Sequence, residues 1–181
     1  MMKEEKMRIR PYKRCDAGEI VNWIGDERHF RYWCADRFDS YPINEDDLSA
    51  QYDSLAMNDD IFHFVAYDED GLLGHFNIRF PDKNDIDTVR FGYVIIDPEK
   101  RGKGLGKQMV ELALHYAKDC LKAKKATIGV FEENAPALHC YLNAGFKECG
   151  KREVFPFHDE EWNYLELEYI FEQKDENGNR E

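Results

Sequence analysis

The stretch that decides the fold is residues 97–107, which read Asp97-Pro98-Glu99-Lys100-Arg101-Gly102-Lys103-Gly104-Leu105-Gly106-Lys107. An apolar run typical of a strand precedes it, and apolar residues at helical spacing follow it. Glycines at such a turn let backbone N–H groups face an anion, and the helix N-terminus adds partial positive charge. Arg101, Lys103 and Lys107 add full positive charges, so the predicted ligand is an oxyanion-rich group such as a pyrophosphate. A basic solvated turn is the alternative interpretation.

Two common phosphate-binding motifs do not fit these residues. A P-loop needs a glycine where the chain has Arg101 and a hydroxyl where it has Gln108. A dinucleotide fingerprint fails because its third glycine is replaced by Lys107. The glycine turn therefore belongs to neither class.

Length and composition indicate one ordinary globular domain. The 181 residues include 43% hydrophobic and 34% charged residues, which excludes disordered and membrane-spanning compositions. No apolar run approaches the roughly 20 residues of a membrane span, and the charged start, residues 1–7, does not resemble a secretory signal. We therefore expect a cytoplasmic protein.

Charge and cysteine content narrow the chemistry further. A formal net charge of -12 argues against nucleic acid as a partner and would attract a cationic amine. The five cysteines contain no CxxC pair, so the sequence indicates reduced thiols and neither a disulfide framework nor a metal site.

Periodicity along the chain predicts a mixed α/β (α+β) fold. Strands are expected over residues 7–12, 61–67, 72–80, 88–96, 127–131, 146–154 and 164–171. Helices are expected to begin at Asp16, Asn44 and Leu105 and just after Asn134. These elements form one domain over residues 7–171, with a polar tail at 172–181. The predicted architecture is a mostly antiparallel sheet of six to seven strands, flanked by about four helices.

The pattern Arg-x-x-Gly-x-Gly, filled by Arg101, Gly104 and Gly106, resembles the pyrophosphate loop of the GNAT superfamily of N-acetyltransferases. A second segment resembles the cofactor segment that follows in that superfamily, with Asn134, Leu138, Tyr141, Gly145 and Phe146. The order of predicted elements agrees over nearly the whole chain. The resemblance implies that acetyl-CoA is the acyl donor and that a primary amine, on a small molecule or a protein N-terminus, is the acceptor.

The resemblance also implies roles for individual residues. Strands 4 and 5 should part in a V, with pantetheine in the gap and hydrogen-bonded to the backbone of Val94, Ile95 and Ile96. The pyrophosphate should lie on Arg101, Gly102, Lys103, Gly104, Leu105, Gly106 and Lys107. Asn134 should bind pantetheine or cap its helix. Tyr141 should contact the cofactor and act as general acid toward the departing thiolate.

The general base does not follow the pattern of the superfamily. Many members place a glutamate early in the fourth strand, where this chain has Arg90. Glu132 is the predicted replacement, and His75, His158, Asp159, Glu160 and Glu161 are further candidates. Because the usual base is missing, a non-catalytic acyl-CoA-binding module stays as the alternative function.

Two aromatic segments are expected to form the acceptor pocket. Residues 29–41 contain Phe30, Tyr32, Trp33, Phe38 and Tyr41, and residues 155–162 mix aromatic and acidic side chains. Together they could form an aromatic, negatively charged pocket for an ammonium group. The same rings could instead fill the core or a homodimer interface. The sequence also leaves open a donor with a longer acyl group.

Overall fold

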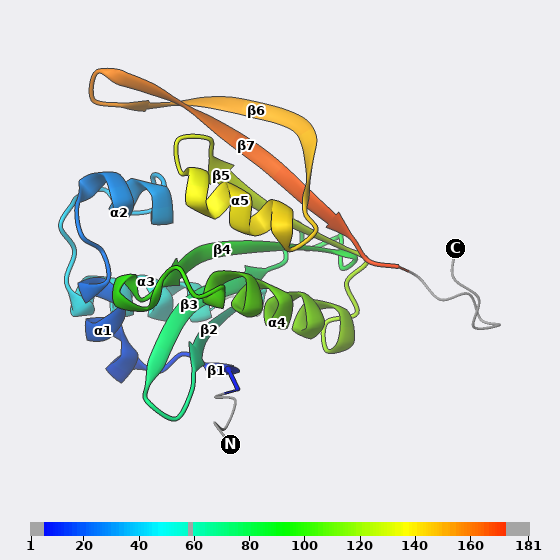
Figure 1. Cartoon of the computed structure of the whole chain (residues 1–181), viewed down its shortest axis with the longest axis horizontal. Coiled ribbons are helices and arrows are strands. Elements are labelled where there is room, and N and C mark those ends of the chain that lie inside the picture. The colour runs from blue at the N-terminus through cyan, green and yellow to red at the C-terminus, as the bar shows by residue number, and fades with distance from the viewer. Residues whose placement is uncertain (1–5, 58–59, 173–181) are drawn as a thin grey trace.

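The computed structural model describes residues 6–57 and 60–172 as one sheet covered by helices (Figure 1). The strands are β1 (Arg8–Pro11), β2 (Ile61–Tyr67), β3 (Leu72–Arg79), β4 (Thr88–Ile96), β5 (Lys125–Phe131), β6 (Lys147–Phe157) and β7 (Glu160–Ile170). The helices are α1 (Ala17–Asn22), α2 (Glu27–Cys34), α3 (Glu45–Ala56), α4 (Leu105–Asp119) and α5 (Ala135–Asn143). The predicted polar tail lies outside the described residues, apart from Glu172.

The seven strands form a single sheet in the order β1-β2-β3-β4-β5-β7-β6. All neighbours are antiparallel except β4 and β5. That parallel pair is short, running from Thr88 opposite Lys125 to Phe91 opposite Ile128. Beyond this point the two strands diverge (Figure 1), so the predicted mixed sheet with a V-shaped splay is confirmed.

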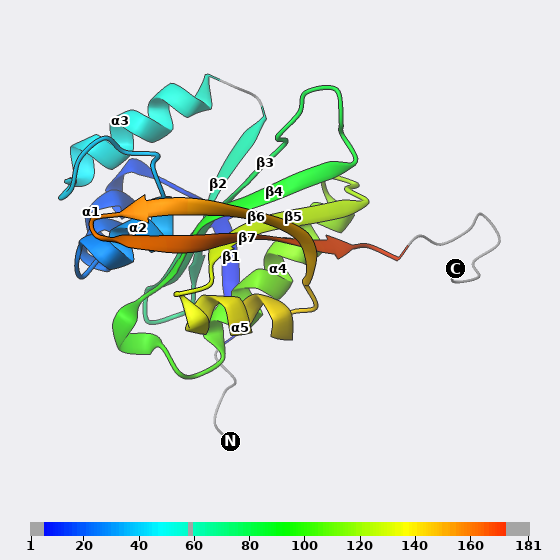
Figure 2. The ribbon, with the colours of Figure 1, turned by 90° about the horizontal axis from the view of Figure 1, so that it is seen from above.

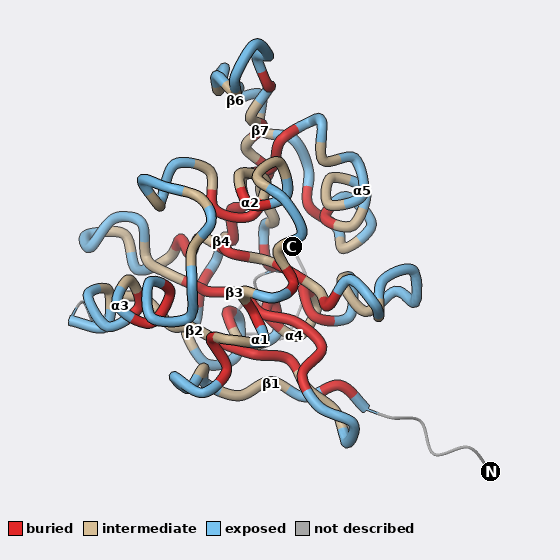
Figure 3. Tube along the Cα trace, turned by 90° about the vertical axis from the view of Figure 1, so that its left-hand side faces the viewer, coloured by how far each residue is buried: buried red, intermediate tan, exposed pale blue. Residues whose placement is uncertain are grey.

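Helices cover both faces of the sheet, and alternate side chains of one strand pack against the helices on one face and on the other. On β2, Phe64 and Ala66 pack in the cluster that contains α4, whereas Val65 packs with α1, α2 and α3. Figure 2 shows α3 and α4 on opposite sides of the sheet. Buried residues follow the central strands, while the edge strand β6 is largely exposed (Figure 3).

The structure adds a fifth helix to the four that were expected, because α2 overlaps the aromatic segment at residues 29–41. The carboxylate of Asp26 caps this helix by accepting a hydrogen bond from the backbone N–H of His29. Phe30, Trp33 and Cys34 form its buried face at helical spacing. The Asp26 cap and the apolar spacing of this buried face are both present in the sequence, but the neighbouring aromatic residues obscure the helical period.

Two further local features are notable. The first helix begins at Asp16 as predicted, since Asp16 is the N-cap of α1, but its carboxylate makes no capping hydrogen bond and instead accepts from the Arg10 guanidinium at 2.8 Å and the backbone N–H of Lys13 at 2.7 Å. The last two strands are longer than predicted, so residues 155–162 form the end of a hairpin instead of a loop. Within that hairpin Trp162 is fully buried.

Helix α4 packs unusually close to the sheet. Its most buried positions include Met109, Val110, Ala113 and Ala117, so small residues form part of the face that meets the sheet. Gly74 on β3 makes this approach possible. A Cβ there would lie 2.7 Å from both the Ile95 carbonyl oxygen and the Met109 sulfur. No helix in the described ranges is long and apolar enough to cross a lipid bilayer.

We predict that Gly74→Ala lowers the free energy of unfolding by about 1 to 3 kcal/mol, because a backbone oxygen and a packed helix must both move to admit the methyl group. Urea denaturation followed by circular dichroism measures the change. Gly25→Ala is the matched control, since nothing lies within 4 Å of its Cβ position. Equal stability of the two variants would contradict close packing of α4 on β3.

Candidate active site

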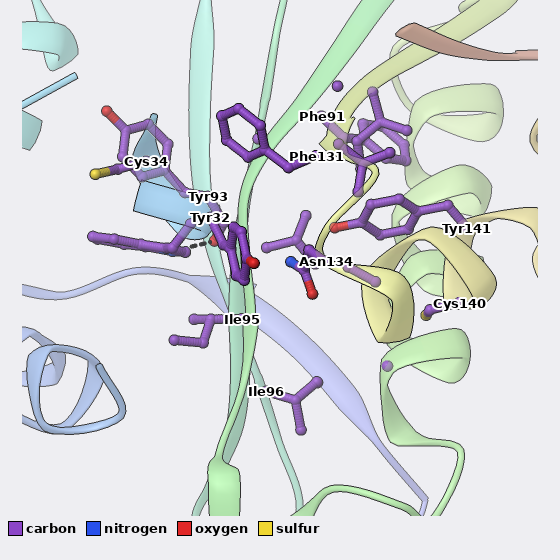
Figure 4. A pocket seen from close by; sticks show the side chains of 18 of the residues that line it. Tyr32, Cys34, Phe91, Tyr93, Ile95, Ile96, Phe131, Asn134, Cys140 and Tyr141 are labelled. Atoms are coloured by element: carbon purple, nitrogen blue, oxygen red, sulfur yellow. Dashed lines mark hydrogen bonds between the residues drawn. The ribbon is translucent and has the colours of Figure 1, made fainter. Parts of the chain in front are cut away.

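A cavity of about 920 Å³ lies where β4 and β5 part. Its wall is built from α2, β3, β4, the glycine turn, β5 and α5. Most of the predicted site residues therefore meet at one place, although they come from separate parts of the chain (Figure 4). Lys103 and all the candidate general bases, Glu132 among them, do not line the cavity.

The glycine turn presents a helix N-terminus without a side-chain cap. Gly104 is the N-cap of α4 and has φ 76°, and Gly102 has φ 79°, both in the left-handed region that favours glycine. Beyond the neighbouring residues of the chain, no atom of residues 6–57 and 60–172 lies within 4 Å of either Cβ position, so the turn is open to a ligand. Within the same ranges no side chain accepts a hydrogen bond from the first N–H groups of α4, which leaves these groups for an anion.

Basic side chains surround this helix end. Arg101 is exposed, and its Nε donates to the Ile96 carbonyl oxygen at 3.3 Å, which ties the guanidinium to the end of β4. Lys107 lies in the first turn of α4, with its Nζ 3.5 Å from Glu111. Both line the cavity, whereas Lys103 is exposed beside it. The turn can therefore hold a diphosphate through backbone donors and one guanidinium.

The free edge of β4 forms one wall of the cavity. Val94, Ile95 and Ile96 all line it, past the last residue paired with β5. The strand carries a bulge here, because two residues, Tyr93 and Val94, face the single residue Phe76 of β3. Tyr93 has φ 52°, and its carbonyl oxygen accepts a 2.9 Å hydrogen bond from Trp33 Nε1. The bulge turns the backbone of β4 at the place where a thioester is expected.

Tyr141 and Asn134 form the opposite wall. Tyr141 is 6% exposed, and its hydroxyl points from α5 into the cavity on the side of Asn134 (Figure 4). Burial raises the pKa of Tyr141, so the hydroxyl stays protonated at neutral pH. Asn134 occupies the N-cap position of α5, but its side chain makes no capping hydrogen bond. Of its two predicted roles, the structure therefore does not support the cap.

The predicted general bases lie outside the cavity. The Glu132 carboxylate faces the other way, accepting from Asn163 Nδ2 at 3.0 Å and lying 3.8 Å from Arg152. His75 is fully buried, with Nε2 2.6 Å from the Tyr52 hydroxyl and Nδ1 2.7 Å from the Phe64 carbonyl oxygen. Burial lowers the pKa of His75 to about 3, so this imidazole is a neutral core group.

The candidates near the β6–β7 turn are also directed elsewhere. His158 Nε2 lies 3.1 Å from Glu27, and Glu160 pairs with Arg28 and accepts from Trp162 Nε1 at 2.7 Å. Asp159 and Glu161 are exposed and do not line the cavity. The prediction of an acidic acceptor pocket from this segment is therefore not supported by the described structure.

The aromatic residues of the predicted acceptor pocket divide into two sets. Tyr32 and Trp33 line the cavity. Phe30, Phe38 and Tyr41 instead pack together in the core, with ring centroids 5.8 Å and 5.1 Å from Phe30. Residues 29–41 therefore contribute to both the cavity wall and the core, and an acceptor site at Tyr32 and Trp33 stays a prediction.

Sequence reasoning missed two groups in the cavity wall. One is His29, which lines the cavity and has its Nδ1 2.8 Å from the Asp26 carboxylate.

The other is a set of polar side chains. Asn77 and Arg79 line the cavity from β3, Arg90 lines it from β4, and Arg37 lines it just after α2. The sequence does contain a signal for Asn77 and Arg79, because polar side chains two residues apart on an apolar strand project from the same face of the sheet. Glu133 is the one carboxylate among the described residues that line this cavity.

Comparison with known proteins agrees with this geometry. The sequence model of the Acetyltransferase (GNAT) family matches residues 20–146. The spermidine N(1)-acetyltransferase of Vibrio cholerae is 26% identical over 170 residues, covering 93% of this chain and 95% of that protein. An N-acetyltransferase 9-like protein of Nematostella vectensis is 28% identical over 86 residues, which is 48% of this chain and 43% of that protein.

Solved structures show the same fold. The crystal structure of the Vibrio cholerae spermidine N-acetyltransferase in complex with CoA and spermine has a TM-score of 0.76, with 23% identity, and covers 91% of this chain and 95% of that one. Since the family model spans well over half of the sequence, the chain belongs to the acetyltransferase (GNAT) family of N-acetyltransferases.

Proposed function

We propose that this chain transfers the acetyl group of acetyl-CoA to a primary amine inside the cavity between β4 and β5. The observation that carries the proposal is the uncapped N-terminus of α4 at Gly104, at the edge of the same cavity as the unpaired edge of β4. A diphosphate bound at the turn leaves its pantetheine arm next to a strand edge that offers backbone donors and acceptors.

The proposed donor site uses the residues predicted from the sequence. Arg101, Lys107 and the N–H groups after Gly104 bind the pyrophosphate, with Gly102, Lys103, Leu105 and Gly106 shaping the turn. The backbone of Val94, Ile95 and Ile96 binds pantetheine, and the side chain of Asn134 binds it from the facing wall. A backbone N–H at the β4 bulge polarises the thioester carbonyl as negative charge develops on its oxygen.

Transfer proceeds by direct attack of the amine on the thioester carbonyl carbon. The C–N bond forms, the C–S bond breaks, and the electron pair of the broken bond leaves on the CoA sulfur. Tyr141 donates its proton to that thiolate and recovers one from solvent. The raised pKa of Tyr141 keeps its hydroxyl protonated, so the proton is present when the thiolate leaves.

The amine must also lose a proton, and we assign its acceptance to His29. Glu132 is left out of the proposal because its carboxylate faces Asn163 and Arg152. His29 lines the cavity from α2, and Asp26 holds its Nδ1 so that Nε2 remains available. A carboxylate behind an imidazole also stabilises the imidazolium that results.

A non-catalytic acyl-CoA-binding module was the alternative to this function. Membership in a family of N-acetyltransferases and a buried tyrosine in the cavity both favour catalysis. Release of free CoA from acetyl-CoA in the presence of an amine panel separates the two functions. Binding of CoA without release for any amine would leave only the binding module.

We predict that Arg101→Gln weakens CoA binding about fivefold to tenfold, because one charge-assisted hydrogen bond to the pyrophosphate is lost. Isothermal titration calorimetry measures the change, and the loss should shrink at high salt. Lys118→Gln, in the last turn of α4, is the control and should bind CoA normally. An unchanged dissociation constant in Arg101→Gln would remove this residue from the donor site.

We predict that Tyr141→Phe lowers kcat at least tenfold and leaves CoA affinity nearly unchanged, because the hydroxyl acts only as the thiolate leaves. Steady-state CoA release and a CoA titration provide the two readouts. Tyr116→Phe is the matched control, since this ring packs against Phe64 on the core side of α4. Normal turnover in Tyr141→Phe would refute the general-acid assignment.

We predict that His29→Gln lowers kcat/KM about tenfold or more at neutral pH and that the deficit narrows at high pH. The free amine then forms in solution, so a base in the protein is no longer needed. His115→Gln, on the exposed side of α4, should retain the normal pH profile. A deficit that stays constant across the pH range would indicate that His29 does not accept the proton.

A further inference from the structure

The end of the cavity away from the glycine turn carries arginines. Arg79 on β3 lies directly opposite Arg90 on β4, at the part of β4 that is still paired with β5. Arg37, just after α2, joins them. All three also line a smaller cavity of about 480 Å³. The two cavities therefore share one cationic wall.

Arg79 is the unsatisfied member of this group. The Arg90 guanidinium binds both oxygens of Glu166 at 2.8 Å and donates to the Tyr164 hydroxyl at 3.1 Å. Arg37 Nε lies 3.7 Å from Asp36. The guanidinium of half-buried Arg79 has no hydrogen bond or ion pair with any of the residues that the structure describes. Burial and the nearby charges of Arg37 and Arg90 lower the pKa of Arg79, so its positive charge is held at an energetic cost.

An unpaired amide lies beside Arg79 on the same face of β3. Asn77 is 2% exposed and lines the cavity, and its Nδ2 has no hydrogen-bond partner within the described part of the chain. Asn77 and Arg79 are two residues apart, so both side chains project to one side of the strand. A buried donor without an acceptor is energetically costly, and an anionic ligand at this place would satisfy it.

The local charge fits a monoanion. The smaller cavity is lined by Arg37, Arg79, Arg90 and Lys151 against Asp36, Glu153 and Glu166, which leaves one positive charge among four cations and three carboxylates. The planar guanidinium matches the two oxygens of a carboxylate, and one net charge matches a carboxylate better than a phosphate dianion. A polyamine would bring several positive charges against this wall.

We propose that the acceptor is an amine that also carries a carboxylate, and that Arg79, with Asn77 and Arg37, binds this carboxylate. This inference rests on the acetyl transfer proposed above. Along β4, Arg90 and Val94 are four residues apart, about 13 Å at strand geometry. The acceptor therefore spans several bonds between its carboxylate at the arginines and its amine beside Tyr141.

A ladder of linear ω-amino acids tests the proposal. At each length the neutral amide and the diamine are compared with the acid, using CoA release from acetyl-CoA. The expected result is that kcat/KM for the best acid exceeds that for its own amide and diamine by about tenfold or more, because one charge-assisted pair with a guanidinium is lost. A phosphonate of the same length distinguishes a carboxylate site from a general anion site and should be the weaker acceptor.

Variants then tie the preference to the proposed residue. Arg79→Met should bring the ratio of acid to amide close to one, and Arg79→Lys should restore it only in part, because lysine keeps the charge but not the planar fork. Arg14→Met is the matched control, since Arg14 pairs with Asp46 and Asp53 on the exposed side of α3. CoA affinity serves as the folding check for all three variants.

The outcomes separate this inference from the proposed function. Failure to bind acetyl-CoA would overturn both. Turnover in which every acid is equal or inferior to its amide or diamine, or an unchanged ratio in Arg79→Met, would overturn the carboxylate site and leave acetyl transfer intact. If no amine is turned over, thermal unfolding of the CoA complex decides. The acids must then raise the Tm more than their amides in the wild type but not in Arg79→Met.

Discussion

The structure depends on the place where β4 and β5 stop pairing. Up to Phe91 and Ile128 the two strands share backbone hydrogen bonds, and the next residue of β5 is Gly129. The Tyr164 ring lies over this glycine so closely that a Cβ there would overlap its hydroxyl. That hydroxyl accepts a hydrogen bond from Arg90 on β4. Tyr164 therefore reaches from β7 across β5 to β4, at the position where the strands begin to separate.

The other side of the gap is maintained by the bulge in β4. Tyr93 adopts a left-handed conformation that costs about a kilocalorie per mole or more for a residue with a side chain. Trp33 Nε1 binds the carbonyl oxygen of Tyr93, and the rings of Trp33 and Tyr52 pack against the tyrosine ring. Helices α2 and α3 thus hold the strained backbone of β4 from behind, at the part of the strand that lines the cavity.

The donor half of the site could be predicted from sequence because its chemistry is local. Gly102, Gly104 and Arg101 lie within a few residues of each other, and the turn, the helix start and the charges can all be read together. The spacing of apolar residues that identifies the strand before this turn and the helix after it is also a local property of the sequence. The helix α2 and the full length of the β6–β7 hairpin were missed because aromatic residues dominate both segments and obscure the turn signals. Glu132 follows β5 directly, yet it faces outward, because side-chain direction after a strand depends on the partner strand β7.

The acceptor half could not be predicted, because it depends on pairings between distant residues. Net charge is a property of the whole surface, and a value of -12 suggested an acidic pocket. The wall of the cavity has the opposite character, since the strand register sets Arg79 opposite Arg90 while most acids lie on the outside. Relatives that share the fold and the glycine turn can therefore differ in acceptor. The donor end is fixed by backbone groups that any sequence supplies, whereas the acceptor end is set by side chains on β3 and β4 that change without altering the sheet. Under the function proposed above, the arginines on β3 and β4 select the acceptor, while the glycine turn and the edge of β4 hold acetyl-CoA.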